Sequence, residues 1–305
     1  MALRVERQRG GIPSGVVAGI VILGVCFLSL VCGELFCRYY LGLGTPPLSI
    51  SDPKIEYLFA PDQDVFRFGN RVVYNHWSMR NEEFPEQPPL DQVRTMVIGD
   101  SVVNGGSLSD QSRLATTILT DDKNLYLNVS AGSWGPANEL AYIRKFGFFD
   151  AKALIVVLSG HDASDLPTFT ALDPNVLPQE TPWLAINEAF ERYLPRYLPG
   201  HHAVASILDE APKHEMDLSP LQAMIELAQS KAISVCVVLH HTRLDRRAGV
   251  LHQGLVAIRY VAEARNVAIV DDKTFLDPDT SYRDDIHLND KGQREEAEAF
   301  LSCKS

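Results

Sequence analysis

One stretch decides the fold of this chain: Thr95-Met96-Val97-Ile98-Gly99-Asp100-Ser101. The apolar run predicts a buried strand, and the Gly-Asp-Ser turn at its end could hold a serine hydroxyl in the open. A serine is a poor nucleophile at neutral pH until a histidine takes its proton, and that histidine needs a carboxylate to orient it. His287 and Asp284, near the other end of the chain, supply both groups.

Short apolar runs alternate with helical patterns from residue 93 to the C-terminus. The patterns predict strands at residues 96–98, 125–128, 153–158, 233–239 and 267–270, and helices at 136–146, 220–232, 250–265 and 291–300. Parallel strands need crossover helices to return the chain. The alternation therefore predicts an α/β domain of three layers, α/β/α, with helices on both faces of a parallel sheet.

Candidate functional residues follow the ends of the predicted strands. In open parallel sheets, ligand sites lie beyond the carboxyl ends of the strands. His287 comes just before the last predicted helix. The other candidates that fall on this same edge are Asp100, Ser101, Gly132, His161, Asp162, His240 and His241.

Each motif alone has a common structural explanation. A serine after a strand is often a helix N-cap, and an Asp-x-x-His segment is often a solvated acidic loop. Here Leu288-Asn289-Asp290-Lys291-Gly292 forms a turn into the final helix. This turn lets Asp284 reach back to the imidazole of His287, while the other ring nitrogen faces Ser101.

Taken together, the motifs resemble the four-block pattern of the GDSL/SGNH hydrolase family, in its membrane-anchored bacterial type. The order and spacing of the blocks carry the resemblance, which covers residues 93–305. The blocks are Gly99-Asp100-Ser101, Asn128-Val-Ser-Ala-Gly132, Gly160-His161-Asp162 and Asp284-x-x-His287-Leu-Asn-x-x-Gly292. The resemblance implies the flavodoxin-like sheet of that family.

The resemblance also implies a role for each site residue. Ser101 would be the nucleophile, His287 the base and Asp284 its orienting acid. The backbone N–H groups of Ser101 and Gly132 would form the oxyanion hole. The family's third oxyanion donor is an asparagine, and this chain has His161 in its place.

His161 has two interpretations. An imidazole can donate an N–H to a developing oxyanion, or the residue can have a structural role in a protein of reduced activity. Candidate substrate-binding residues are Asp100, Asp162 and His240; the alternative for His240 is a hydrogen-bonded histidine at the edge of the site. No cofactor and no metal site is expected.

The N-terminus predicts a membrane anchor. Residues 1–11 read as a basic cytoplasmic tail and residues 12–36 as a transmembrane helix, because about 20 apolar residues cross a bilayer. The arginines ahead of the span place the N-terminus in the cytoplasm and the catalytic domain in the periplasm or outside the cell. A cleaved signal peptide is the alternative, but residues 32–36 lack a good small-x-small site.

The remaining segments connect this anchor to the main domain. Residues 37–92 read as a linker and N-terminal extension, with an extended Pro-rich spacer at 44–53 and a β-hairpin whose turn is Gly69-Asn70. The SGNH hydrolase-like domain is expected at residues 93–305. Its insertion at 163–217 reads either as a lid beside the site or as a surface helical hairpin.

Charge and cysteine content limit the partners. The chain of 305 residues has a net charge of −11, which disfavours nucleic acid because phosphates demand a basic face. Its 46% apolar content can bury a large core. The five cysteines show neither a disulfide framework nor metal spacing, so buried thiols are expected at Cys26, Cys32, Cys37, Cys236 and Cys303.

These observations predict a membrane-anchored SGNH-type serine esterase that acts through an acyl-enzyme. Its expected substrates are ester (O-acyl) groups of cell-surface polysaccharide. One alternative is an O-acyltransferase for exopolysaccharide that uses the same triad. Another is a catalytically silent SGNH-fold protein that binds carbohydrate or assists assembly, which the histidine at position 161 motivates.

Overall fold

The central element is a five-stranded parallel sheet in the strand order β6-β5-β7-β8-β9. The computed structural model describes residues 13–197 and 215–303. The strands are β5 (Val93–Gly99), β6 (Asn124–Ser130), β7 (Ala153–Ser159), β8 (Ser234–His240) and β9 (Ala268–Asp271). In chain order this is 2-1-3-4-5, the doubly wound flavodoxin-like arrangement. The predicted parallel sheet is confirmed.

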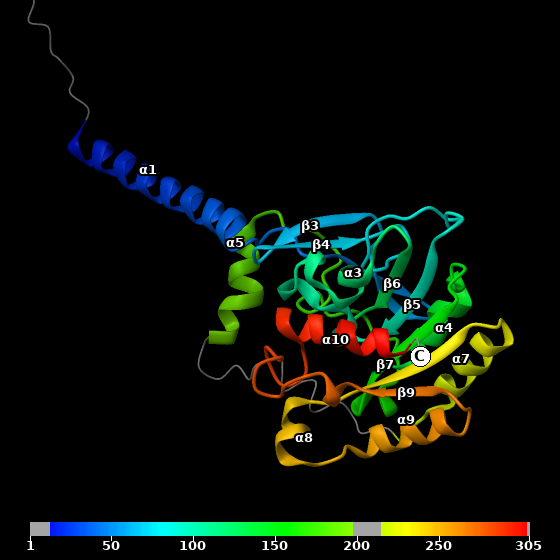
Figure 1. Cartoon of the computed structure of the whole chain (residues 1–305). Helices are drawn as coiled ribbons and strands as arrows, with labels where there is room; N and C mark the ends of the chain where they lie inside the picture. Colours follow the sequence, from blue (N-terminus) through cyan, green and yellow to red (C-terminus); the bar gives the residue numbers. More distant parts are fainter. Residues whose placement is uncertain (1–12, 198–214, 304–305) are drawn as a thin grey trace, which may run out of the picture.

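Helices cover both faces of the sheet (Figure 1). One face packs against α4 (Pro136–Phe146), α7 (Ser219–Ser230) and α9 (Gln253–Glu263), and the other against α3 (Ala115–Leu119) and α10 (Asp290–Ser302). Alternation along β5 explains the division, because successive side chains of a strand point to opposite faces. Met96 and Ile98 join the first core, and Val97 packs with Phe300 of α10. The predicted three-layer α/β/α fold is confirmed.

One predicted helix differs from the structure. The expected helix at residues 250–265 begins only at Gln253, because His252 is the N-cap and its side chain accepts the N–H of Gly254. A separate short helix, α8 (Arg243–Ala248), precedes it and ends at Gly249 with a φ of +66°. The apolar pair Val250 and Leu251 is exposed and lies between the two helices.

The segment before the main sheet forms two small antiparallel pairs. They are β1 (Ser49–Asp52) with β2 (Glu56–Phe59), and β3 (Gln63–Arg67) with β4 (Asn70–Tyr74). In the second pair Arg67 is opposite Asn70, so the turn residues are Phe68 and Gly69. Both have positive φ, 50° and 81°, as a two-residue hairpin turn requires. The hairpin is present, but its turn lies one residue earlier than predicted.

The Pro-rich segment 44–53 is packed instead of extended as a spacer. Gly44 and Ser49 are buried, and Ser49 begins strand β1. The N–H of Gly44 donates to the carboxylate of Glu188 at 2.7 Å, and Glu188 also forms a buried ion pair with Arg67. The expectation of a free spacer is wrong, because these buried contacts fasten the segment to the domain.

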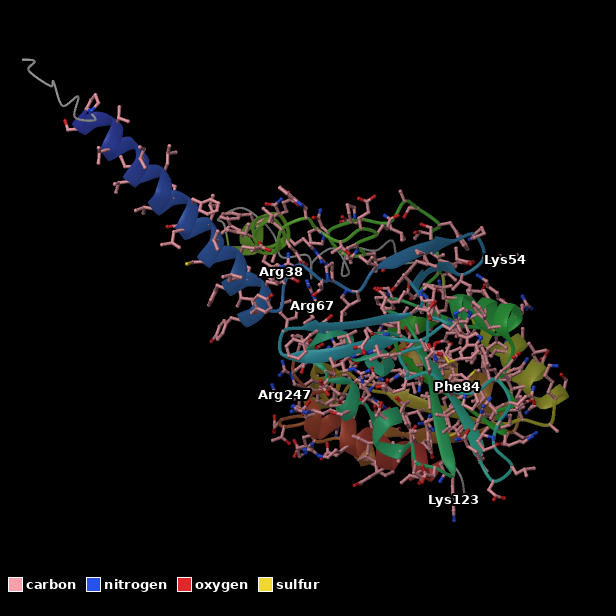
Figure 2. The ribbon with its side chains drawn as sticks, turned by 90° about the horizontal axis from the view of Figure 1, so that it is seen from above. Arg38, Lys54, Arg67, Phe84, Lys123 and Arg247 are labelled. Atoms are coloured by element: carbon pink, nitrogen blue, oxygen red, sulfur yellow. A yellow bond between two sulfur atoms is a disulfide. The ribbon has the colours of Figure 1, made fainter. Side chains whose placement is uncertain are left out.

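The apolar N-terminal helix extends away from the domain (Figure 2). Helix α1 (Ser14–Leu35) continues as a π-helix, η1 (Phe36–Tyr40), and this continuous helix is long and apolar enough to cross a membrane. Its end contacts α5 (Ala185–Glu188), which continues as η5 (Ala189–Tyr193) and η6 (Leu194–Tyr197). Residues 1–11 of the expected tail, and residues 198–214 of the expected insertion, lie outside the described residues.

A disulfide joins Cys236 of β8 to Cys303 after α10. Their Cα atoms are 5.7 Å apart although 67 residues separate them in the sequence. The expectation of buried thiols is wrong for this pair, because only the packing of α10 on the sheet brings the two cysteines together. Among the described residues, Cys26, Cys32 and Cys37 are free, and only Cys37 of these three is buried.

Candidate active site

The strand β5 ends in a tight turn that presents Ser101. A Cβ at Gly99 would lie 2.7 Å from a methyl group of Val103 and 3.0 Å from the carbonyl oxygen of Val157, so only glycine fits there. Asp100 is the N-cap of α2 (Ser101–Asn104), and its carboxylate accepts the N–H of Val102 at 2.8 Å. Ser101 is therefore the first residue of a helix whose start is fixed by the close packing at Gly99 and by the N-cap at Asp100.

Three side chains from opposite ends of the sequence meet at this turn. The Oγ of Ser101 is 2.9 Å from Nε2 of His287. Nδ1 of the same imidazole is 2.9 Å from Oδ2 and 3.1 Å from Oδ1 of Asp284. These distances are those of hydrogen bonds from a nucleophile to a base and from the base to an orienting carboxylate.

Asp284 is held by its own loop. Its Oδ1 accepts the backbone N–H groups of Ile286, at 3.0 Å, and His287, at 2.7 Å. Burial opposes ionisation of this carboxyl group, but the hydrogen bonds and charge of His287 outweigh it and lower the pKa of Asp284. The carboxylate is thus ionised at neutral pH and can stabilise an imidazolium at His287.

Arg283 connects the histidine loop to the serine loop. Its Nη1 donates to the carbonyl oxygen of Gly105 at 3.0 Å and to Oγ of Ser109 at 3.1 Å. The guanidinium therefore bridges the two chain segments that carry the nucleophile and the base. Sequence reasoning missed this residue, although it directly precedes Asp284 in the sequence.

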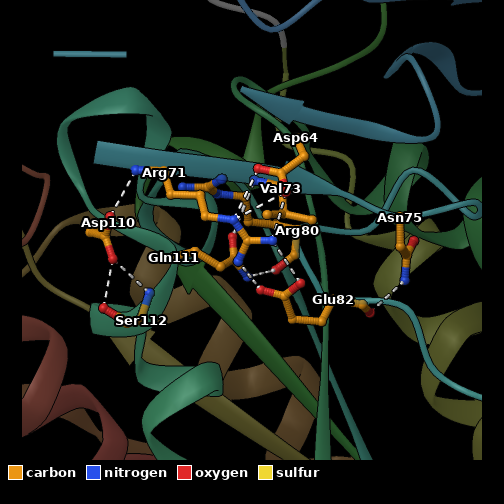
Figure 3. A network of polar contacts seen from close by, with 9 residues as sticks. All are labelled: Asp64, Arg71, Val73, Asn75, Arg80, Glu82, Asp110, Gln111 and Ser112. Carbon is orange, nitrogen blue, oxygen red and sulfur yellow. Dashed lines mark hydrogen bonds and ion pairs between the residues drawn. The ribbon is translucent and has the colours of Figure 1, made fainter. Parts of the chain in front are cut away.

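The loop after Ser101 is also fastened to the β3–β4 hairpin and the segment that follows it, and Figure 3 shows the contacts of Arg71 with Asp110 and of Arg80 with Gln111. Arg80, 0% exposed, donates to the carbonyl oxygens of Gly106 and Ser109 at 3.3 Å and 3.0 Å. The N–H of Arg71 donates to Asp110 at 2.7 Å, and Gln111 donates to the carbonyl oxygen of Arg80 at 3.2 Å. No motif in the sequence links Arg80 to the serine loop, so sequence reasoning missed this support.

Gly132 lies after β6, beside the same turn. The hydroxyl of Tyr57 donates to its carbonyl oxygen, and Trp134 donates from its indole N–H to the carbonyl oxygen of Tyr57 at 3.2 Å. Asn104 of α2 donates to the carbonyl oxygen of Ser130 at 2.9 Å, which ties the end of β6 to the nucleophile helix. The backbone that would supply the second oxyanion N–H is thus fixed by side chains from three segments.

His161 begins the 3₁₀ helix η4 (His161–Ala163), directly after β7 and Gly160. Its Nε2 is 3.2 Å from Oδ1 of Asp162 and 3.5 Å from Oδ2 of Asp100, and its side chain is 45% exposed. One ring nitrogen therefore faces two buried carboxylates, which leaves Nδ1 as the nitrogen available to a substrate. β5 and β7 are neighbours at the point where the strand order reverses, which is where ligands bind in such sheets.

The charges of this cluster follow from its surroundings. The charge of Asp162, and then the contact with Asp100, raise the pKa of His161 above its usual range. Burial opposes ionisation of Asp100, but the hydrogen bond and charge of His161 lower its pKa. Burial raises the pKa of Asp162, whose other oxygen accepts the N–H of Ser159 at 2.6 Å. The charged form of His161 and the ionised form of Asp100 therefore stabilise each other.

The three expected substrate-binding residues are all buried. Asp100 and Asp162 are 2% and 1% exposed, and His240 is 0% exposed. The two aspartates contact His161, and His240 contacts Asp272 and the carbonyl oxygen of Ile286. For His240 these contacts favour the alternative of a hydrogen-bonded histidine at the edge of the site, and substrate binding by the two aspartates stays a prediction.

Three groups within the described residues bring histidine and carboxylate ligand atoms within 4.8 Å of one another. They are Asp100-His161-Asp162, His240-Asp272-Glu296 and His241-Asp271-Asp272. Each histidine pairs with a carboxylate of its own group, at 3.2 Å, 2.5 Å and 2.9 Å respectively. These ion pairs account for the closeness of the ligand atoms.

No family model and no curated protein matches this chain. Among solved structures, it is similar to a member of the lipolytic G-D-S-L family from Veillonella parvula DSM 2008, with 15% identity and a TM-score of 0.41. The match covers 69% of this chain and 97% of that one. It is also similar to an acetylxylan esterase from Geobacillus stearothermophilus, with 13% identity, a TM-score of 0.40, and coverage of 70% and 95%.

The fold and the site define a class for this chain. It is a doubly wound α/β protein with a Ser-His-Asp arrangement at the carboxyl edge of a parallel sheet. The solved structures that it is similar to include GDSL-family lipolytic proteins and an acetylxylan esterase.

Proposed function

We propose that this chain is a membrane-anchored serine esterase of the SGNH type, which acts on O-acyl groups of cell-surface polysaccharide. The observation that carries the proposal is the continuous hydrogen-bonded line from Ser101 Oγ through His287 to Asp284. The four-block resemblance of the sequence supports the same reaction class.

The proposed reaction begins with attack of Ser101 on an ester carbonyl. His287 takes the hydroxyl proton at Nε2, and Asp284 stabilises the imidazolium that results. Collapse of the tetrahedral intermediate breaks the bond to the alcohol, which leaves with the proton returned by His287. The acyl-enzyme is then discharged by water, which His287 activates in the same way.

The negative charge on the carbonyl oxygen needs hydrogen-bond donors. As the first residue of α2, Ser101 has a backbone N–H that the helix itself does not use. Gly132 supplies a second N–H, and His161 supplies a third donor from its positively charged ring. Loss of one oxyanion donor typically costs about 3–4 kcal/mol of transition-state stabilisation, so this third donor is an important part of the proposal.

The anchor is part of the proposed function because it determines where in the cell the enzyme encounters its substrate. The continuous helix from Ser14 to Tyr40 contains an 18-residue window with a mean hydropathy of 2.7, and 0% of that window is buried in the protein. Its end is integrated into the domain, since Glu34 accepts the N–H groups of Ala185 and Ile186 at 3.0 Å. Tyr39, 77% exposed, adds an aromatic ring at the level where a bilayer surface would lie. These contacts favour a retained anchor over a cleaved signal.

The disulfide supports an exterior location for the domain. Disulfides persist in oxidising compartments and are rare in the cytosol. Cys236 and Cys303 form one within the main domain. An exterior domain beside the membrane would meet acyl groups on surface polysaccharide, and it fits the orientation expected from the N-terminal arginines.

The first experiment measures ester hydrolysis by the full chain in lipid nanodiscs. Turnover of a short aryl ester is expected, together with labelling by a serine-directed phosphonate. Ser101→Ala should abolish both, whereas Ser230→Ala, an exposed serine at the end of α7, should retain both. Wild-type turnover no higher than that of Ser101→Ala, without labelling, would favour the catalytically silent alternative.

A second experiment identifies the acceptor and the location. Incubation with O-acetylated polysaccharide should release free acetate; transfer of the acetyl group to an added sugar, without free acetate, would favour the acyltransferase alternative. Protease treatment of intact cells after opening of the outer envelope should digest the domain while the protein's N-terminus stays protected. Mature protein that begins beyond residue 35 would show a cleaved signal instead.

A further inference from the structure

A second histidine–aspartate pair lies beneath the loop that carries Asp284 and His287. His240 ends β8 and Asp272 begins the 3₁₀ helix η7 (Asp272–Thr274), and both side chains are 0% exposed. Nδ1 of His240 is 2.5 Å from Oδ2 of Asp272, and Nε2 is 2.9 Å from the carbonyl oxygen of Ile286. The ring therefore joins the edge of the sheet to the histidine loop.

The partners of His240 determine its protonation state. A carbonyl oxygen and an ionised carboxylate only accept hydrogen bonds, so each ring nitrogen must carry a hydrogen. The other oxygen of Asp272 accepts the backbone N–H of His241 at 3.2 Å, so both oxygens of this side chain face hydrogen-bond donors. His240 is thus an imidazolium that donates in two directions.

The charges around the ring agree with this assignment. Burial alone would lower the pKa of His240, but the charge and hydrogen bond of Asp272 raise it to about 9. Burial, followed by the charge of Asp272, raises the pKa of Glu296, which adds little negative charge at neutral pH. The groups that face the ring are Asp272 of η7, Glu296 of α10, Tyr282 of the loop and Asp100 after β5.

The contact with Ile286 reaches the catalytic carboxylate through a single peptide group. The carbonyl of Ile286 and the N–H of His287 belong to the same planar peptide. That N–H donates to Oδ1 of Asp284 at 2.7 Å. The imidazolium therefore holds one end of a rigid group whose other end holds Asp284.

Backbone groups after β8 hold the outer side of the same loop. The N–H of Arg243 donates to the carbonyl oxygen of Asp285 at 2.7 Å, and the N–H of Leu244 donates to its carboxylate at 2.9 Å. These contacts place the loop over the sheet edge. The contact from His240 acts from beneath and fixes the orientation of the 286–287 peptide.

We propose that His240 is a positioning residue for the reaction of Ser101. Its imidazolium, fixed on Asp272, orients the 286–287 peptide so that Asp284 and His287 stay aligned with the serine. This inference rests on the proposed function, because it concerns the geometry of that site. Loss of the contact should lower kcat more than it changes KM, since His240 lies beneath the loop and not on its solvent side.

Two substitutions separate the two contacts of the ring. In His240→Gln the side-chain amide reaches the position of Nε2 and can still donate to Ile286, whereas in His240→Asn it reaches only the position of Nδ1 and Asp272. In the full chain in nanodiscs, His240→Asn should lower kcat by about 100-fold, the usual effect of a misplacement of about 1 Å. His240→Gln should retain most of the wild-type kcat near pH 7.

His241→Gln is the matched control. His241 is the next residue, is 3% exposed, and pairs with Asp271 at 2.9 Å instead of contacting Ile286. It should retain the wild-type kcat. A His240→Asn variant that melts at a lower temperature but keeps the wild-type kcat would show that His240 is merely structural and would overturn the proposal.

The pH profile gives a readout that does not need the Asn variant to fold. The kcat of the wild type should fall as the pH rises through about 9, where His240 loses its proton. His240→Gln should lack this decrease, because an amide does not titrate there. Wild-type and Gln profiles that coincide above pH 8 would overturn the proposal.

Hydrogen exchange separates failure of this inference from failure of the proposed function. If the wild type hydrolyses no ester, the esterase assignment fails, but the amides of residues 284–288 still report on the loop. Faster exchange there in His240→Asn than in His240→Gln would support positioning by His240. Equal exchange in wild type and both variants would overturn it.

Discussion

Two histidine–aspartate pairs in this molecule have similar geometry and opposite environments. His287 and Asp284 have side chains that are 28% and 50% exposed, whereas His240 and Asp272 are both 0% exposed. The second nitrogen of His287 faces a hydroxyl group, which can give up a proton. The second nitrogen of His240 faces a carbonyl oxygen, which cannot. In each pair, the role therefore depends on the group that faces the ring nitrogen not bonded to the carboxylate. A hydroxyl partner lets the pair transfer a proton, whereas a carbonyl partner lets it hold the loop in place.

The largest effect is expected when the exposed pair is broken. Asp284→Asn should lower kcat by about 10⁴-fold, because an amide no longer selects the tautomer of His287 or stabilises its charged form. Stability should change little, since a solvent-exposed pair contributes only about 0–1 kcal/mol. Steady-state kinetics and urea unfolding measure the two quantities.

Asp279→Asn is the control for this substitution, because Asp279 forms an exposed ion pair with Arg247 away from the triad. Full activity in Asp284→Asn would show that the carboxylate is not the orienting acid.

The buried pair should show the opposite pattern. Asp272→Asn leaves the buried imidazolium of His240 without its counter-charge, and such a loss typically costs about 3–5 kcal/mol of unfolding free energy. Chemical denaturation of the full chain in detergent checks this. A stability loss no greater than that of Asp284→Asn would contradict the claim that burial separates the two pairs.

Substitution of His161 tests a third histidine–aspartate contact. Its histidine is 45% exposed, whereas its partner Asp100 is buried. His161→Ala should lower kcat by about 10²–10³-fold if the ring donates to the oxyanion. His161→Asn should preserve or raise turnover, since an amide is a neutral donor of similar reach. Turnover unchanged in His161→Ala would show that the oxyanion role is wrong.

The smallest effect is the pH dependence of stability. The pKa of His240 is raised from 6.5 to about 9, so its contribution is complete below pH 6.5 and is lost as the pH rises through 9. The unfolding free energy should therefore decrease by at most about 1.4 kcal/mol per pH unit in this range. The decrease in unfolding free energy per pH unit should be smaller in His240→Gln than in the wild type. Equal decreases in the two proteins would mean that groups other than His240 cause the pH dependence.

Much of the fold could be predicted because it follows from local patterns. The apolar run ending at Gly99, and the alternation of strands and helices after it, require a parallel sheet whose carboxyl edge collects Ser101, Gly132 and His161. The period of the apolar residues and the length of the segments between strands can both be read from a single sequence. The hairpin turn was misplaced by one residue because Gly69 suits either position.

The supports of the site could not be predicted, because they are contacts across long sequence separations. Arg80 binds carbonyl groups of the serine loop, and Tyr57 binds Gly132, without any motif that links these positions. The disulfide of Cys236 and Cys303 was missed for the same reason.

The sequence by itself determined the parallel α/β sheet, the apolar N-terminal helix, and the identities of Ser101, Asp284 and His287. Only the tertiary structure decided which histidine faces a hydroxyl and which is enclosed. The burial of a side chain and its hydrogen-bond partners depend on how distant segments pack. Neither can be read from the residue type alone. His240 therefore looked like a site residue in the sequence, while the fold places it beneath the site as a fixed charge.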